Sequence, residues 1–250
     1  MKTFGLLLVA GSLWAGCSAV QADPSSNVTA ALGNAARAKD AEADARRHPA
    51  ELAAFAGLKP GDTVVDLIPG GGYFTRIFSL IVGPKGHVYA IWPSEYAKED
   101  SDELPLIEAI AKDPHFANVT ILTQPAAAFT IPVKADVVWT SQNYHDYPDK
   151  FMGPTDPKLL NAAVFKALKP GGVYIVIDHA AEPGSGARDT DTLHRIDPAL
   201  VKTQVLAAGF KLDGQSDVLH NAADSHKVKV FDASVRGHTD QFVFRFRKPL

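Results

Sequence analysis

Hydrophobic residues along this chain recur in short runs, and longer segments of mixed apolar and polar residues separate these runs. Apolar runs of about five residues that are rich in Val and Ile predict buried strands, and the mixed segments between them predict helices. The expected strands are 63–68, 87–92, 119–123, 135–140 and 173–178, and the expected helices are 73–82, 104–112, 157–168 and 198–208. This alternation is typical of a parallel sheet that helices cover on both faces.

The two ends of the chain depart from this alternation. Two strand-like segments, Phe210–Leu219 and Asp240–Arg247, have no helix between them and predict an antiparallel pair at one edge of the sheet. Before the first strand, the alanine-rich segment Ala30–Arg47 predicts one helix, and HPAELAAFAG (His48–Gly57) predicts another, with Pro49 in its first turn. The expected fold class is α/β: a single doubly wound, mostly parallel seven-stranded sheet with an antiparallel C-terminal hairpin and N-terminal helices.

The first residues have the composition of a secretory signal. Lys2 precedes an apolar run from Phe4 to Gly16, which is too short to cross a bilayer but long enough for the core of a signal peptide. Small residues before Asp23 suit cleavage by a signal peptidase, whereas LWAGC resembles a lipoprotein box that would place a lipid on Cys17. We therefore expect an exported protein, either periplasmic or an outer-membrane lipoprotein. The expected division is a signal peptide at 1–22, a tether with N-terminal helices at 23–57 and one α/β domain at 58–250.

Composition excludes several classes of function. Cys17 is the only cysteine, so the folded part has no disulfide, thiol catalysis or cysteine metal site. The net charge is −3, and the lysines and arginines are scattered, so nothing indicates nucleic-acid binding. After the signal, no apolar run is long enough for a second membrane span.

The stretch VVDLIPGGGYFTR, from Val64 to Arg76, predicts a buried strand that ends in a glycine turn before a helix. Glycine permits a sharp turn and the close approach of a ligand, and the helix start offers unpaired N–H groups. In a doubly wound sheet this turn lies at the carboxyl edge, where ligands bind. The dinucleotide pattern G-x-G-x-x-G is incomplete, because Thr75 stands where Gly70 and Gly72 would require a third glycine.

The glycine turn resembles the first motif of the class I S-adenosylmethionine-dependent methyltransferases, in which an acidic residue precedes a glycine-rich turn. FKALKPGGVYIVIDHA is similar to the late helix, turn and fifth strand of that fold, and TDQFVFRFRKP is similar to its closing hairpin. The motifs PGGGYFTR, NYHD and ARDTDTLHRID further resemble a group of exported bacterial predicted methyltransferases. The resemblance implies S-adenosylmethionine as cofactor and methyl transfer to an unknown small molecule or envelope component. The cofactor-binding residues expected on this basis are Asp66, Gly70, Gly71, Gly72, Tyr73, Trp92 and Gln124.

Two positions depart from the methyltransferase pattern. The family has an Asp or Glu after the second strand for the ribose hydroxyls, whereas this chain has Trp92 there and Glu95 three residues later. Gln124 and Pro125 replace the acidic residue expected near the adenine. Gln124 can hydrogen-bond to adenine, and Trp92, like Trp139, is either an aromatic wall or a core residue. A lost ionic hydrogen bond of about 1.5–3 kcal/mol predicts an affinity lower by about one to two powers of ten.

Titratable residues are concentrated in two further loops at the same sheet edge. SQNYHDYPD follows the fourth expected strand, and GARDTDTLHRID follows the fifth, which ends in an Asp-His pair. A histidine beside a carboxylate can act as the general base when a hydroxyl or amine accepts the methyl group. The expected catalytic residues are His145, the first candidate for the base, Asp146, Asp178 and His179, and the expected substrate-binding residues are Asn143, Tyr144, His194 and Arg195.

Two other interpretations stay open. His145, Asp146, Asp178, His179 and His194 can supply nitrogen and oxygen ligands to zinc or a similar ion, as a metal-dependent hydrolase would require. No His-x-x-x-His or Glu-x-x-His spacing supports such a site, so we expect no metal. The chain can also be an exported ligand-binding protein that has the methyltransferase fold but no transfer activity.

Overall fold

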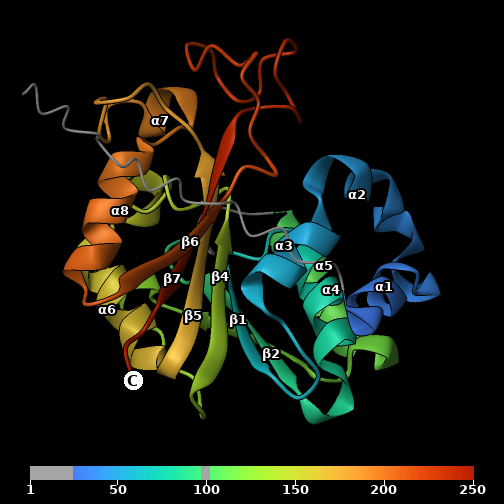
Figure 1. Cartoon of the computed structure of the whole chain (residues 1–250). Helices are drawn as coiled ribbons and strands as arrows, with labels where there is room; N and C mark the ends of the chain where they lie inside the picture. The colour runs from blue at the N-terminus through green and yellow to red at the C-terminus, as the bar shows by residue number, and fades with distance from the viewer. Residues whose placement is uncertain (1–24, 97–101) are drawn as a thin grey trace, which may run out of the picture.

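The computed structural model of the chain describes residues 25–96 and 102–250 (Figure 1). In these ranges seven strands form one sheet in the order β3-β2-β1-β4-β5-β7-β6, and only β7 runs antiparallel to its neighbours. The predicted fold class is therefore confirmed. The strands are β1 (Thr63–Leu67), β2 (His87–Pro93), β3 (Val119–Gln124), β4 (Ala135–Ser141), β5 (Leu168–His179), β6 (Lys211–Ser216) and β7 (Gln241–Arg247).

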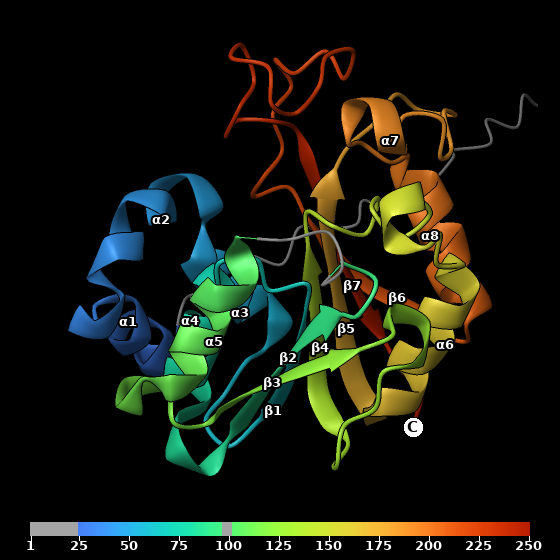
Figure 2. The same ribbon diagram turned by 180° about the vertical axis from the view of Figure 1, so that it is seen from behind.

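Helices cover both faces of the sheet, as the two opposite views show (Figures 1 and 2). The first three helices gather beside α4 and α5 on one face, whereas α6 and α8 lie on the other. The helices are α1 (Ser26–Leu32), α2 (Ala41–Arg47), α3 (Pro49–Ala56), α4 (Tyr73–Val82), α5 (Glu103–Lys112), α6 (Pro157–Ala167), α7 (Thr190–Leu193) and α8 (Pro198–Ala207). None of the helices in the described parts of the chain is long and apolar enough to cross a membrane.

Each face of the sheet has its own hydrophobic core. Successive side chains of a strand point to opposite faces, so Val64 packs with Phe78 of α4, whereas Val65 packs with Val164 of α6. All four side chains are buried. Strands that are covered on both faces explain the nearly continuous apolar runs from which they were predicted.

The prediction of one long helix at Ala30–Arg47 is wrong. The segment forms the end of α1, a 3₁₀ turn at Ala35–Asp40 and then α2. Asn34 interrupts the helix because its side-chain oxygen accepts the N–H of Ala36 (2.9 Å) and caps the new turn. Within the segment expected to hold a tether and N-terminal helices, the chain is already helical from Ser26. The predicted signal peptide at 1–22, including Cys17, lies outside the described residues.

The strand order reverses between β1 and β4. From β1 the chain crosses to β2 through α4, and from β4 it crosses to β5 through α6, which lies on the opposite face. Loops that leave adjacent strands toward opposite faces open a crevice at the carboxyl edge of a sheet. The segment 217–240, between β6 and β7, extends past the same edge near α7 (Figure 1).

Candidate functional site

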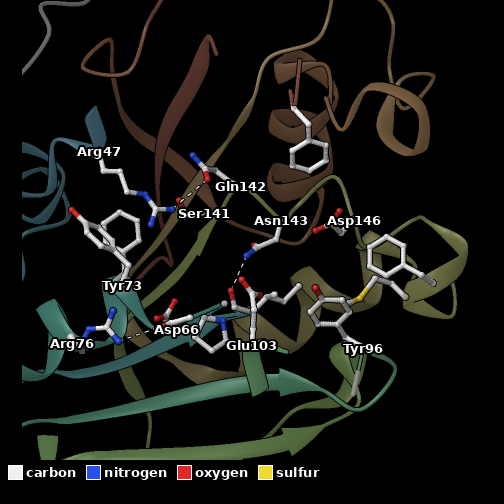
Figure 3. Close-up of a pocket in the computed structure, with 18 residues that line it drawn as sticks. Arg47, Asp66, Tyr73, Arg76, Tyr96, Glu103, Ser141, Gln142, Asn143 and Asp146 are labelled. Carbon is white, nitrogen blue, oxygen red and sulfur yellow. Dashed lines mark hydrogen bonds between the residues drawn. The ribbon is translucent and has the colours of Figure 1, made fainter. Parts of the chain in front are cut away.

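A cavity of about 490 Å³, here called the main cavity, lies where β1 and β4 end (Figure 3). Asp66, Gly70 and Gly71 line it from β1 and the following turn, and Asn143 and Asp146 line it from the loop after β4. The volume is within the range of about 300–1,000 Å³ that is typical of small-molecule sites. The structure therefore brings these five predicted residues to one cavity.

The three glycines of the turn have different surroundings. Gly70 has a left-handed backbone (φ +53°) and faces the main cavity beside Gly71. Gly72 is also left-handed (φ +78°), but a Cβ there would lie 2.1 Å from Ile110 Cδ1 and 2.9 Å from Ile107 Cδ1 of α5. Gly72 does not line the cavity, and its missing side chain lets α5 pack onto the turn. This differs from the cofactor contact that was predicted for it.

Asp66 lies at the end of β1 and faces the main cavity. Its Oδ2 accepts a hydrogen bond from Thr75 Oγ1 (2.6 Å). Burial raises the pKa of Asp66 to about 7, and the Thr75 hydrogen bond and the Arg47 charge offset this only in part. The carboxyl group is therefore poised to titrate near neutral pH.

Contacts with Asp40 and Asp44, which lie at and just after the start of α2, fix the glycine turn. Arg76 donates to both carboxylate oxygens of Asp40 (2.6 and 2.7 Å) and, through Nη1, to the carbonyl oxygen of Gly71 (3.0 Å). The Tyr73 hydroxyl donates to Asp44 (2.7 Å), while the Tyr73 ring lines the main cavity. Arg76 and Asp40 are thus paired inside the protein and hold the turn in place.

The structure does not bring Trp92 or Gln124 to the main cavity. Trp92 is fully buried, and the ring of Tyr96 stacks on it at a centroid distance of 5.1 Å. Tyr96, which the sequence interpretation missed, lines the cavity instead (Figure 3). The Gln124 side chain bonds to the backbone N–H and carbonyl of Thr130. Trp92 packs in the core, and Thr130 holds Gln124, so neither side chain lines the cavity. The signal that could have identified Tyr96 was an aromatic residue just after β2.

Two charged residues at the main cavity gave no signal in the sequence. Glu103, at the start of α5, brings its carboxylate over the turn, since a Cβ on Gly70 would lie 3.5 Å from Glu103 Oε2. Arg47, at the end of α2, donates to Gln142 Oε1 (3.3 Å), and its guanidinium lies 4.5 Å from the centre of the Tyr73 ring. Figure 3 shows Arg47 and Tyr73 on one side of the cavity and Tyr96 on the other, with Asp66 and Glu103 between them.

Two non-glycine residues that directly follow strands at this edge have left-handed backbone conformations. Ile68 (φ +50°) follows β1, and Gln142 (φ +64°) follows β4. Their N–H groups are held by the carbonyl oxygens of Ile91 (3.0 Å) and Ile177 (2.8 Å), respectively. Asn143 joins the two loops, because its Nδ2 donates to the Ile68 carbonyl (2.9 Å). Strained backbone of this kind concentrates at ligand-binding sites.

The side chain of His145 lies between two carboxylates. Its Nδ1 donates to Asp178 Oδ1 (2.8 Å), and its Nε2 is 3.1 Å from Asp146 Oδ1. Burial disfavours the imidazolium, but the Asp178 and Asp146 carboxylates outweigh burial and raise the pKa of His145 to about 10. A protonated ring that is engaged at both nitrogens does not fit the general base that was predicted from the sequence.

Two further histidines neighbour His145. Ring centroids lie 5.5 Å away for His194 and 6.0 Å away for His179. His194 Nδ1 is 4.0 Å from Asp146 Oδ1, and His179 Nδ1 is 2.7 Å from Thr239 Oγ1. Burial lowers the pKa of both rings, which favours neutral imidazole. The group called the histidine cluster below consists of His145, Asp146, Asp178, His179 and His194.

The structure does not support substrate contacts by Tyr144 and Arg195. Both side chains are fully buried. The Tyr144 hydroxyl accepts from Asn161 Nδ2 (2.8 Å) and donates to Gln204 Oε1 (3.1 Å). Arg195 pairs with the buried Asp224 (2.9 Å). These two residues join segments of the fold, because their polar groups find partners away from the cavity.

A second cavity of about 140 Å³, the side cavity, adjoins the main one. The two share the lining residues Arg47, Phe74, Ser141, Gln142 and Phe231. His179 also lines the side cavity, together with Arg46 and Arg236. A ligand in the main cavity and a second molecule in the side cavity would therefore lie next to each other.

No family model matches this chain, but the chain is similar in sequence to a curated protein and in fold to many solved structures. The chain is 30% identical over 129 residues to a protein-L-isoaspartate O-methyltransferase from Ignicoccus hospitalis. That match covers 52% of each protein, so the chain spans about half the length of this relative.

The structural comparisons concern the fold. An S-adenosylmethionine-dependent methyltransferase from Aquifex aeolicus has a TM-score of 0.54 at 19% identity, over 78% of this chain and 86% of that one. The [4+2]-cyclase SpnF has a TM-score of 0.59 at 17% identity, over 94% of this chain and 88% of its own. A glycopeptide N-methyltransferase, MtfA, complexed with S-adenosylmethionine has a TM-score of 0.54 at 16% identity, over 83% of this chain and 87% of that one. The chain thus has the class I S-adenosylmethionine-dependent methyltransferase fold.

Proposed function

We propose that this protein is an S-adenosylmethionine-dependent methyltransferase that acts on a small molecule or an envelope component. The observation that carries this proposal is the main cavity, in which Gly70 and Gly71 and the buried Asp66 meet at the switch point of the sheet. This edge is where a doubly wound fold binds its ligand. The likeness to methyltransferases in sequence and fold supports the same assignment.

The residues that line the main cavity fit S-adenosylmethionine. Gly70 and Gly71 leave room for the amino-acid end of the cofactor to approach the backbone. Tyr96 offers an aromatic face for the adenine. The carboxylate that is missing at the end of β2 is replaced by Glu103, which reaches over Gly70 from α5. We assign the ribose hydroxyls to Glu103, and the bound cofactor would supply an electrophilic methyl group.

The side cavity is the proposed seat of the methyl acceptor. Three arginines, Arg46, Arg47 and Arg236, line it, and within the described ranges none of them forms an ion pair with a carboxylate. Unpaired guanidinium groups suit an acidic acceptor, for which they provide bidentate hydrogen bonds. The relative from Ignicoccus hospitalis is named for transfer to isoaspartate, which is also an acid. Placing the acceptor in line with the methyl group is a large part of catalysis in such a direct displacement.

Calorimetry with S-adenosylmethionine and S-adenosylhomocysteine tests the proposal. The wild-type protein should bind both ligands, and failure to bind either at millimolar concentration would overturn the assignment. Glu103→Gln should weaken binding about ten- to a hundredfold, because it removes an ionic hydrogen bond. Glu108→Gln, on an exposed part of the same helix, is the matched control and should bind like the wild type.

We also propose that the protein is exported. The support is the sequence of residues 1–22, where Lys2 and an apolar run precede small residues before Asp23. Mass spectrometry of the native protein should find a chain that starts at Asp23, or a lipid-modified Cys17. An intact Met1 in the cytoplasmic fraction would contradict both forms of export and leave the enzymatic proposal standing.

A further inference from the structure

We propose that His145, Asp146 and His194 form a binding site for a first-row divalent metal ion, of the zinc type, at the border of the main cavity. One ligand atom from each residue lies within 4.8 Å of the others. Zinc ligands bind at about 2.0–2.2 Å, so two ligands of one ion lie about 3–3.5 Å apart. His145 Nε2 and Asp146 Oδ1 are already 3.1 Å apart, and His194 Nδ1 is 4.0 Å from Asp146 Oδ1. The ion would take the place of the proton that His145 Nε2 shares with Asp146 in the metal-free protein, and binding would release that proton.

The Asp178 carboxylate holds His145 in the way that carboxylates hold metal-binding histidines. Asp178 is fully buried and accepts the Nδ1–H of His145, which directs Nε2 toward Asp146. The same carboxylate accepts the backbone N–H groups of His145 and His179 (both 2.8 Å), so it cannot swing away without losing them. Histidines that bind zinc commonly donate their other ring N–H to a carboxylate in this way, which fixes the orientation of the ring.

The charges around the cluster call for a cation. Three carboxylates, those of Asp146, Asp149 and Asp178, interact electrostatically with His145. In the described parts of the chain no lysine or arginine forms an ion pair with any of the three. Asp149 is buried, and its Oδ2 has no hydrogen-bond partner there, although Oδ1 accepts from Thr190. An unpartnered buried carboxylate oxygen is costly, and a nearby cation reduces that cost.

The donor set selects the kind of ion. Two imidazole nitrogens and one carboxylate suit zinc and its first-row neighbours better than magnesium or calcium, which prefer oxygen ligands. Three protein ligands leave at least one coordination position open, as in catalytic zinc sites. Asp146 also lines the main cavity, as does Phe231, whose ring packs on His194 at 5.0 Å. An acceptor in the adjoining side cavity, which shares Phe231 with the main cavity, can therefore present an oxygen to the ion beside the cofactor.

Binding of the ion stands on the geometry alone, whereas its role in orienting the acceptor rests on the proposed function. Cobalt(II) is a suitable probe, because its visible absorption reports coordination by the protein. The full chain, stripped with a chelator, should bind one Co²⁺ per molecule, and Zn²⁺ should displace it. His194→Gln and Asp146→Asn should each weaken Co²⁺ binding at least about tenfold, and Asp178→Asn should weaken it about ten- to a hundredfold.

The control is His226→Gln. His226 also contacts a carboxylate, that of Asp240 (2.9 Å), but it is not part of a three-ligand group in the described residues. This variant should bind Co²⁺ like the wild type. Absence of Co²⁺ binding, or equal affinity in wild type, His194→Gln and Asp146→Asn, would overturn the site. His194 is 26% exposed, so its replacement should leave the fold intact, which thermal unfolding of the same samples can verify.

S-adenosylmethionine calorimetry on the same samples separates the two proposals. Loss of Co²⁺ binding in His194→Gln with unchanged cofactor affinity is the expected result. A wild-type protein that binds Co²⁺ but not S-adenosylmethionine would overturn the proposed function and leave the metal site in place. A protein that binds the cofactor but not Co²⁺ would overturn the metal site and leave the proposed function in place.

Discussion

The glycine turn and the histidine cluster face the same crevice but differ in how their charges are satisfied. At the turn, Arg76 forms two short hydrogen bonds with Asp40, and both side chains are nearly excluded from solvent. In the cluster, Asp146 has only histidines as ion-pair partners among the described residues, and the neighbouring Asp149, whose carboxylate interacts electrostatically with His145, has a buried oxygen without a hydrogen-bond partner there. The Arg76–Asp40 pair is therefore electrostatically complete, whereas the carboxylates of the second region are not.

We interpret the glycine turn as a structural framework and the histidine cluster as a reactive region. Buried charges that are fully paired fix a conformation, since removing one partner leaves the other uncompensated. Buried charges that lack partners persist where a ligand, an ion or a reaction makes use of them. We infer that the turn holds one ligand in a fixed position, while the charge balance of the cluster changes when a ligand or an ion binds there. Four measurements test this contrast.

The largest effect is expected from removing one charge in each region. Asp40→Asn should lower the free energy of unfolding by about 3–5 kcal/mol, because the buried Arg76 loses its partner. Asp149→Asn should leave the free energy of unfolding of the metal-free protein unchanged or raise it, since burial already raises the pKa of this carboxyl group. Urea unfolding at neutral pH measures both. Equal losses in the two variants would remove the contrast.

The next effect concerns packing beneath the turn. Gly72→Ala should cost about 2–4 kcal/mol of unfolding free energy, because the new Cβ would overlap Ile110 and Ile107 in a left-handed backbone. Gly61 has a similar backbone (φ +86°) but open space around it, so Gly61→Ala should cost only about 1 kcal/mol. Urea unfolding of the two variants isolates the contribution of the contact with α5. Similar costs would mean that α5 does not need the glycine.

A pH effect of intermediate size should come from Asp66. Its folded-state pKa of about 7 is above the ordinary value of 3.8, so the folded state binds the proton more tightly than the unfolded chain does. This contribution to stability is present below the ordinary pKa and is lost as pH rises to about 7. Between pH 5 and pH 8 the wild type should lose about 2–3 kcal/mol more than Asp66→Asn. Denaturant unfolding at the two pH values measures this difference, and parallel curves would show that Asp66 is ionised throughout.

The smallest effect distinguishes an aromatic residue that lines the main cavity from an aromatic residue on the preceding strand that does not. Tyr96→Ala should weaken S-adenosylmethionine binding about tenfold, the equivalent of about 1.4 kcal/mol, through loss of the adenine-facing ring. Tyr89→Ala, in β2 but away from the main cavity, should bind the cofactor like the wild type. Calorimetry gives both affinities. Unchanged binding in Tyr96→Ala would place the adenine elsewhere.

Much of the fold could be predicted because its signals are local. The strand β1 and the helix α4 were expected within one residue of where they lie, since a β-branched run, a glycine turn and an amphipathic segment follow each other directly. The break at Asn34 was missed because alanine-rich composition favoured helix more visibly than one capping side chain opposed it. Propensity is an average over a segment, whereas a cap acts at one residue.

In the candidate site, too, local signals were predicted and the effects of packing were missed. Asp66, Gly70 and Gly71 were found because they are neighbours in sequence, and the order of strands alone sends them to the carboxyl edge. Glu103 and Arg47 were missed because each reaches the cavity from a helix whose position depends on packing. Trp92 was misplaced, since strand periodicity does not tell which face is covered by which helix.

The sequence by itself determined the α/β class, the position of the glycine turn and the identity of the titratable residues that follow β4 and β5. Only the tertiary structure decided which of those residues meet. His145 and His194 are 49 positions apart in the printed chain, yet their rings come within 5.5 Å. The physical reason is that secondary structure follows from contacts between near neighbours, whereas the charge balance of a buried cluster depends on every segment that folds around it.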